Sequence, residues 1–264
     1  MLRFAANLTT MYGALPVLDA IAAAAGDGFE AVECRTVFDY PKEEVRDALA
    51  RHGVTLVQFN CPMGNMAAGE RGLACVPGRD DAFRDSIVPA IEYARALGVG
   101  QVNCVAGIPG PGHHDAAEIE SLMIENLTYA APRFADAGVK LQIEPINPVD
   151  NKGVFFTRTD QFERIHERVG SDNLYLQYDF YHLQITQGDL LRHFERLQPL
   201  INHVQVAGVP NRDEPDNGEV AYSFVLSELE RLGYQGWVGC EYVPAGTAAE
   251  GLSWLDEYRR SATM

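Results

Sequence analysis

The sequence Lys-Leu-Gln-Ile-Glu-Pro-Ile-Asn at positions 140–147 indicates the fold most directly. A short apolar run of strand length ends on Glu144, and Pro145 follows at once. Proline lacks a backbone donor and does not continue a central strand, so the chain must turn there. We therefore expect Glu144 at the rim of a buried strand, where a carboxylate needs a cation, a hydrogen-bond partner or a catalytic role.

The same pattern recurs along the chain. The segment at positions 237–244 predicts a strand that ends on Glu241, and positions 174–179 predict one that ends on Asp179. Positions 202–208 form another predicted strand, in which His203 and Gln205 point to the same side because strand side chains alternate. Buried strands with polar residues at their carboxyl ends are typical of enzymes built on a parallel sheet.

Predicted strands and helices alternate eight times over 264 residues. Such alternation requires parallel strands joined by right-handed crossovers, so the chain is α/β. We predict one (β/α)8 TIM-barrel domain over residues 1–264. A doubly wound open sheet is the alternative, but no Gly-x-Gly-x-x-Gly follows the first strand.

The connections carry further expectations. Residues 180–182 are expected to continue the rim after Asp179, before a helix at 187–197, and the last helix is predicted at 248–260. The Gly-, Met- and Pro-rich segment at 61–79 is long enough for a binding loop. Its adjacent Glu70 and Arg71 either close over a ligand or form a solvated salt link.

Composition narrows the function. The formal net charge is −16, so the surface repels phosphate backbones and nucleic acid is not an expected partner. No apolar run reaches membrane-spanning length and the first residues do not resemble a signal peptide, so we expect a cytoplasmic protein without a membrane partner. The sequence leaves a homo-oligomer open.

Neither cysteine nor paired histidine predicts a metal site. Five scattered cysteines with no Cys-x-x-Cys motif argue against a disulfide framework or structural zinc, and we expect them to be buried. His113 and His114 precede a predicted helix, and adjacent residues do not share a helix face.

The strand ends do predict a metal site. In a barrel, the carboxyl ends of successive strands meet at one face. Three carboxylates and one amide oxygen would meet there and suit Mg²⁺ or Mn²⁺ better than zinc or copper. Without a cation the carboxylates would repel one another, although four separately bonded polar groups are the alternative. The four residues are Glu144, Asp179, Gln205 and Glu241.

Several longer strings resemble the hydroxypyruvate isomerase family of xylose isomerase-like barrels, including its 2-oxo-tetronate isomerase branch. They are Ile-Glu-Pro-Ile-Asn at 143–147, Tyr-Asp-Phe-Tyr-His at 178–182, Gly-Trp-Val-Gly-Cys-Glu-Tyr at 236–242, Ala-Ala-Gly-Glu-Arg-Gly at 67–72, Pro-Gly-Arg at 77–79 and Arg-Asp-Glu-Pro-Asp-Asn-Gly-Glu at 212–219. The likeness extends from residue 3 nearly to the end of the chain.

The resemblance implies an activity. It implies that Glu144 and Glu241 are catalytic, and that Glu144, Asp179, Gln205 and Glu241 hold a divalent metal. The family interconverts hydroxypyruvate and 2-hydroxy-3-oxopropanoate through an enediol, by proton transfer between two glutamates. The substrate expected here is a small anionic 2-oxo acid.

Four residues are candidates for substrate binding. His182 stands where related barrels place a ligand to a substrate oxygen, or else packs at the rim. Arg212 is a candidate counter-charge for the substrate carboxylate, with a surface salt bridge as the alternative. Glu70, in the binding loop, and Asn7, at the end of the first strand, complete the set.

Other functions are disfavoured. The segment at 207–219 resembles the four-carbon 2-oxo-tetronate branch, whereas Glu-Pro-Ile-Asn and Ala-Gly-Glu-Arg-Gly favour hydroxypyruvate. Gln205 stands where ketose 3-epimerases use histidine, which disfavours that activity. A metal phosphodiesterase would need a histidine-rich site and a basic face. A non-catalytic sugar-acid binding protein is the remaining alternative.

Overall fold

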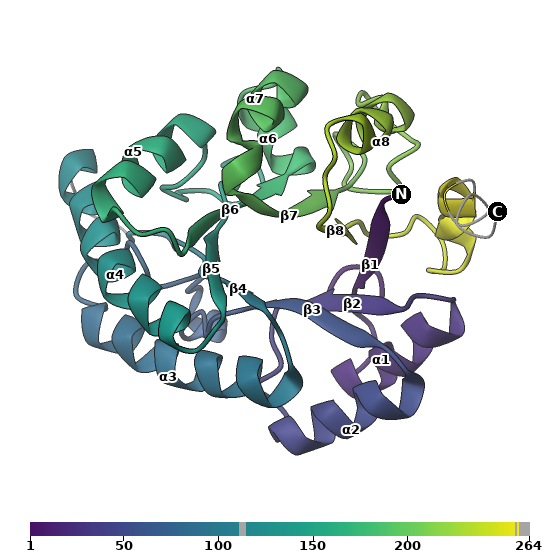
Figure 1. Ribbon diagram of the computed structural model, residues 1–264, viewed down its shortest axis with the longest axis horizontal. Helices are drawn as coiled ribbons and strands as arrows, with labels where there is room; N and C mark the ends of the chain where they lie inside the picture. The colour runs from purple at the N-terminus through teal and green to yellow at the C-terminus, as the bar shows by residue number, and fades with distance from the viewer. Residues whose placement is uncertain (111–114, 257, 259–264) are drawn as a thin grey trace.

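Eight parallel strands close into a barrel, as Figure 1 shows. The computed structural model describes residues 1–110, 115–256 and 258. The strands follow chain order around the barrel, and the first pairs with the last. They are β1 (Arg3–Asn7), β2 (Ala31–Cys34), β3 (Thr55–Asn60), β4 (Gln101–Asn103), β5 (Lys140–Ile143), β6 (Leu174–Asp179), β7 (Ile201–Val206) and β8 (Trp237–Cys240). The predicted α/β barrel is confirmed.

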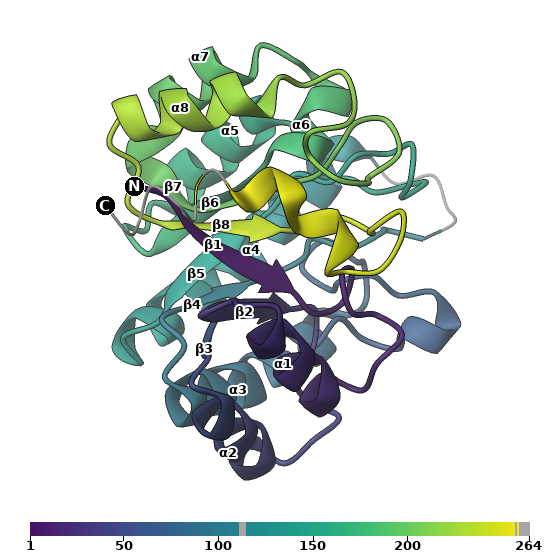
Figure 2. The same cartoon turned by 90° about the vertical axis from the view of Figure 1, so that its right-hand side faces the viewer.

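Helices surround the barrel and pack on its outer face (Figures 1 and 2). The α-helices of the described residues are α1 (Val17–Gly26), α2 (Lys42–His52), α3 (Asp80–Leu97), α4 (Ala116–Asp136), α5 (Thr159–Val169), α6 (Phe180–Thr186), α7 (Leu190–Leu197) and α8 (Tyr222–Arg231). Three short 3-10 helices are η1 (Met66–Ala68), η2 (Gln198–Leu200) and η3 (Glu250–Leu255). Within the described ranges, no helix is both long and apolar enough to cross a membrane.

Sequence signals at the helix ends explain why these segments are helical. The helix α2 begins after Pro41, carries acidic residues in its first turn and basic residues in its last, and ends at Gly53 with φ of 66°. This order matches the helix dipole and the left-handed conformation that glycine adopts at helix ends. The helix therefore begins and ends at the residues that carry these signals.

Two connections differ from expectation. Residues 180–182 lie in helix α6 instead of extending the rim, because the Asp179 side chain accepts a hydrogen bond from the Tyr181 backbone and caps this helix. The helix predicted at 187–197 consequently begins at Leu190. The last predicted helix is a 3-10 helix over Glu250–Leu255, and part of its predicted range lies outside the described residues.

The segment after β8 covers the outer face of β1. In Figure 2, η3 (yellow) lies beside β1. The ring of Trp254 meets that of Phe4 edge-on, with centroids 5.7 Å apart. This contact buries apolar surface of β1, in addition to the apolar faces of the α-helices against the rest of the barrel.

The barrel interior is polar instead of aliphatic. Its centre is the buried amide of Gln177, whose oxygen accepts hydrogen bonds from Gln58 (3.2 Å) and Gln142 (2.8 Å). The Gln177 nitrogen donates to Gln205 over 2.6 Å. Gln205 in turn donates to Glu33, which is fully buried and also bonds His203. Each of these amides donates to an acceptor, whereas the Gln58 and Gln142 oxygens have no hydrogen-bond partner among the described residues.

Gly239 on β8 is expected to be indispensable to this interior. A Cβ atom at this position would lie 2.3 Å from Glu33 Oε2. We expect Gly239→Ala to lower the free energy of unfolding by about 1–3 kcal/mol, because the buried Glu33 carboxylate would have to leave its partners. Urea unfolding of both proteins measures the loss.

Gly100→Ala is the matched control. A Cβ at Gly100 meets nothing within 4 Å, and the position is exposed. The same substitution should therefore change the unfolding free energy by less than about 0.5 kcal/mol. Equal effects of the two substitutions would contradict the steric role assigned to Gly239.

Candidate active site

Three acidic residues stand at the carboxyl ends of their strands. Glu144 follows β5, Asp179 is the last residue of β6, and Glu241 follows β8. Strand β5 ends at Ile143, just before Glu144 and Pro145, and the backbone N–H of Glu241 donates to Val206 on β7. The parallel barrel therefore brings to one face three side chains that lie far apart in the sequence.

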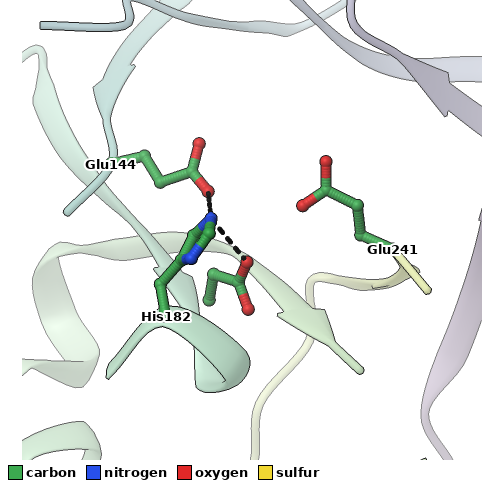
Figure 3. Close-up of side chains that lie close together, drawn as sticks. Glu144, His182 and Glu241 are labelled. Carbon is green, nitrogen blue, oxygen red and sulfur yellow. Dashed lines mark ion pairs between the residues drawn. The ribbon is translucent and has the colours of Figure 1, made fainter. Parts of the chain in front are cut away.

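These carboxylates lie close together around His182. Glu144, Asp179, His182 and Glu241 each offer a ligand atom within 4.8 Å of the others. The Nε2 atom of His182 is 3.8 Å from Glu144 Oε1 and 3.5 Å from Asp179 Oδ2. In Figure 3, Glu144 and Glu241 reach in from opposite sides, with His182 beside Glu144.

Burial and mutual repulsion disfavour the ionised carboxylates. Burial first, then the charges of Glu241 and Asp179, holds the pKa of Glu144 well above its usual value. Burial first, then the charge of Glu241, raises the pKa of Asp179 to about 7. Burial also raises the pKa of Glu241, while Arg212 opposes that shift. The cluster is therefore short of positive charge.

This arrangement fits a divalent cation. The Asp179 Oδ2 atom is buried and has no hydrogen-bond partner among the described residues. A buried carboxylate oxygen without a donor, next to two further carboxylates, is the environment that a hard cation stabilises. The residues that could hold it are Glu144, Asp179, Glu241 and, by its position, His182.

Gln205, the fourth predicted ligand, has other partners. It pairs with Asp179 in the register of β6 and β7. Its oxygen accepts from Gln177 and its nitrogen donates to Glu33, each over 2.6 Å. Glu33 only accepts, so this amide orientation is determined by the network. Ligation by Gln205 stays a prediction that would use the second lone pair of its oxygen.

Arg212 lies at the cluster. Its guanidinium donates to Glu241 Oε2 over 2.8 Å and is 4.0 Å from Asp179 Oδ2. It also stands 4.9 Å above the ring of Tyr181. Its charge therefore offsets the carboxylates already, which leaves less of it for a substrate.

Asn7 and Glu70 are bonded elsewhere. Asn7 is buried, donates to Glu33 and accepts from the backbone at Thr9. Glu70 pairs with Arg79 at 2.9 Å and accepts from a loop backbone N–H. The salt link of Glu70 is thus with Arg79 and not with the adjacent Arg71, whose guanidinium donates to the backbone carbonyls of Met66 and Glu70. Substrate binding by Asn7 and Glu70 stays a prediction.

The sequence interpretation missed two arginines. A cavity of about 120 Å³ opens at the site. Arg35 follows β2 and Arg71 follows Glu70, and both line this cavity. The search for polar residues at the carboxyl ends of predicted strands (the strand-end rule) found Glu144 and could also have found Arg35. The cavity is lined by Arg35, Asn60, Met63, Arg71, Val105, Glu144, Ile146, Asn151, His182, Arg212 and Glu241.

No cysteine lines the cavity. All five cysteines are free and buried, as predicted. Burial is the leading cause that raises the pKa of Cys34, to about 12, which suits a packed thiol better than a nucleophile. His113 and His114 lie outside the described residues.

Comparison with known proteins places this geometry in a family. Residues 20–258 match the family described as xylose isomerase-like TIM barrel. The chain belongs to this family. It is 44% identical over 258 residues to a 2-oxo-tetronate isomerase of Cupriavidus necator, covering 98% of this chain and 99% of the relative. It is 42% identical over 259 residues to the hydroxypyruvate isomerase of Escherichia coli, covering 98% and 100%.

A solved structure has the same fold. It is titled AP endonuclease, family 2, from Brucella melitensis. It shares 41% identity and a TM-score of 0.93 with this chain, covering 98% of this chain and 99% of its own. More distant structures, such as a D-psicose 3-epimerase at 14% identity and a TM-score of 0.80, show the fold alone. The resemblance inferred from the sequence is confirmed.

Proposed function

We propose that the protein is an aldose–ketose-type isomerase that interconverts hydroxypyruvate and 2-hydroxy-3-oxopropanoate. The observation that carries this proposal is the pair Glu144 and Glu241, which face one small cavity from opposite sides (Figure 3). Full-length relatives at 42–44% identity are named as isomerases of small 2-oxo acids, which supports the same chemistry here.

The proposed mechanism uses the two glutamates as proton carriers. One removes the proton from the hydroxyl-bearing carbon of the substrate, the hydroxyl proton passes to the neighbouring carbonyl oxygen, and the other glutamate delivers a proton to the neighbouring carbon. Both belong to an environment in which burial raises the carboxyl pKa, which favours reversible proton transfer. His182 lines the same cavity and would bind a substrate oxygen.

A divalent metal, Mg²⁺ or Mn²⁺, is proposed as the cofactor. Glu144, Asp179 and Glu241 would hold it, with Gln205 as the predicted fourth ligand. When bound, a cation of this kind supplies electrostatic stabilisation for negative charge that develops on substrate oxygens. The oxygen-rich ligand set favours these hard ions over zinc.

The cavity favours a small anion. Its volume of about 120 Å³ is below the roughly 300–1,000 Å³ of pockets for drug-sized ligands. Arg35 and Arg71 line it, and no salt bridge of either guanidinium is found among the described residues. We therefore add them to Arg212 as candidates for binding the substrate carboxylate.

A four-carbon substrate is the second candidate. The segment at 207–219 resembles the 2-oxo-tetronate branch, and the Cupriavidus necator relative carries that name. The solved structure titled AP endonuclease raises a third activity. A formal net charge of −16 opposes binding to a phosphate backbone, so we do not favour it.

Direct assay tests the function. The purified, Mg²⁺-loaded protein should isomerise hydroxypyruvate or 2-oxo-tetronate, with the aldehyde and ketone forms followed by proton NMR. The larger kcat/KM identifies the substrate branch. A protein that turns over neither acid, with Mg²⁺ or Mn²⁺, would contradict the proposal.

A further inference from the structure

Asn147 has a buried amide whose orientation is determined by its neighbours. Its oxygen accepts from the backbone N–H groups of Val149 (3.0 Å) and Asp150 (2.9 Å). Its nitrogen donates to Asp150 Oδ2 over 3.0 Å and meets His182 Nδ1 at 2.7 Å. Exchanging the amide atoms would set the nitrogen against two donors and the oxygen against a carboxylate, so the orientation is unambiguous.

This orientation determines what His182 can do. The Asn147 nitrogen can only donate, so His182 Nδ1 must accept. A neutral imidazole carries its single proton on the other nitrogen, Nε2. The doubly protonated ring carries a proton on both nitrogens and could not accept at Nδ1, so this contact also requires a neutral ring.

The partner of Asn147 is also held in place. Asp150 Oδ2 accepts a second hydrogen bond from the Tyr181 hydroxyl, over 2.7 Å. Tyr181 and His182 are adjacent residues of α6, so the loop after Glu144 and the start of α6 are joined twice. The contact between Asn147 and His182 is therefore part of a closed network and not of an isolated pair.

We propose that Asn147 is a positioning residue that holds His182 in the Nε2–H tautomer. In this tautomer His182 donates a hydrogen bond from Nε2 to a substrate oxygen and has no Nε2 lone pair for a cation. Of the four clustered side chains, only the three carboxylates then act as metal ligands. The role in substrate binding rests on the proposed function, whereas the tautomer does not.

The tautomer can be measured directly. Protein labelled with ¹⁵N-histidine gives long-range ¹H–¹⁵N spectra in which the chemical shift of each ring nitrogen shows whether it carries a proton. The signal that is absent from the spectrum of His182→Gln belongs to His182. We expect Nδ1 to be unprotonated and Nε2 protonated at neutral pH, both without metal and with saturating Mg²⁺. A protonated Nδ1, or an Nε2 that loses its proton when Mg²⁺ binds, would overturn the proposal.

A double substitution tests the role of Asn147 itself. In Asn147→Asp/Asp150→Asn, the new carboxylate still accepts from the two backbone N–H groups and from the new amide, but it presents an acceptor to His182 Nδ1. We expect Nδ1 to become protonated and kcat to fall at least about 100-fold, with a smaller change in KM. Circular dichroism and thermal unfolding verify the fold.

Asp150→Asn alone is the matched control. Its new amide oxygen can accept from both Asn147 and Tyr181, so the contact with His182 is kept. In Asp150→Asn, the tautomer of His182 and the kcat should therefore stay close to those of the parent protein. An unchanged tautomer in the double variant, or a reversed one with parental kcat, would refute the positioning role. If the parent shows the expected tautomer but no isomerase activity, the proposed function fails and the role of Asn147 in setting the tautomer stands.

Discussion

Glu241→Gln is expected to lower kcat for isomerisation by about 10³-fold or more, and Glu144→Gln by a similar factor. Each glutamine keeps the size of the side chain but cannot carry a proton between substrate carbons. The two glutamates face the cavity from opposite sides, so neither can readily replace the other (Figure 3). Steady-state kinetics on the preferred acid measures the effect, and circular dichroism verifies the fold.

Solvent exchange separates the roles of the two glutamates. In D₂O, a variant that keeps the glutamate which removes the first proton should still exchange the carbon-bound hydrogen of its substrate, although it forms no product. We therefore expect exchange to survive in one of the two variants. Glu228→Gln, the same substitution on the outer helix α8, should leave kcat unchanged. Near-parental kcat in Glu241→Gln or Glu144→Gln would refute the two-glutamate mechanism.

Removal of the metal is expected to abolish turnover, and Mg²⁺ or Mn²⁺ should restore it. Asp179→Asn should weaken metal binding by about 100-fold or more, measured by titration calorimetry, because it removes one of three clustered charges. The substitution keeps the oxygen that caps α6, so the fold should persist. Unchanged metal affinity in this variant would contradict a site at the cluster.

The metal-free protein should also respond to pH. The pKa of Asp179 is raised to about 7 in the folded state from a usual value of 3.8, so the folded state holds its proton more tightly. Its contribution to stability is present below pH 4 and is lost as pH rises towards 7. The Tm of metal-free protein should therefore fall by several degrees over this range, and by less in Asp179→Asn. Asp85→Asn, on the exposed face of α3, should behave as the parent.

The sequence predicted the barrel because its signals are local. Strand runs, helix caps and glycine stops recur in order, and the strand-end rule brought Glu144, Asp179 and Glu241 to one face. The same rule could not assign hydrogen-bond partners. Asn7 and Gln205 both bond Glu33, a partner distant from each in sequence, whose carboxylate is visible as a hub only once the barrel closes.

Loops limited the prediction of the site. The string Ile-Glu-Pro-Ile-Asn marks Asn147 as part of a motif, but its contact with His182 depends on how the loop after β5 folds back on α6. Residues 180–182 were predicted as rim because the sequence does not show that one oxygen of Asp179 caps a helix while its other oxygen stays free for the cluster. Glu70 pairs with Arg79 and does not line the cavity, whereas the adjacent Arg71 does, and the sequence offers no signal for this difference.

The amide network inside the barrel has a consequence for directed evolution. Gln58, Gln142 and Gln177 share hydrogen bonds so that each amide determines how the next one points. Replacing one of them by an apolar residue leaves the neighbouring amides without hydrogen-bond partners, whereas a coordinated replacement of the whole group does not. Libraries that randomise these positions one at a time should yield mostly insoluble clones. Altered specificity is better sought at the outer wall of the cavity, where Arg35 and Arg71 can change without disturbing the interior.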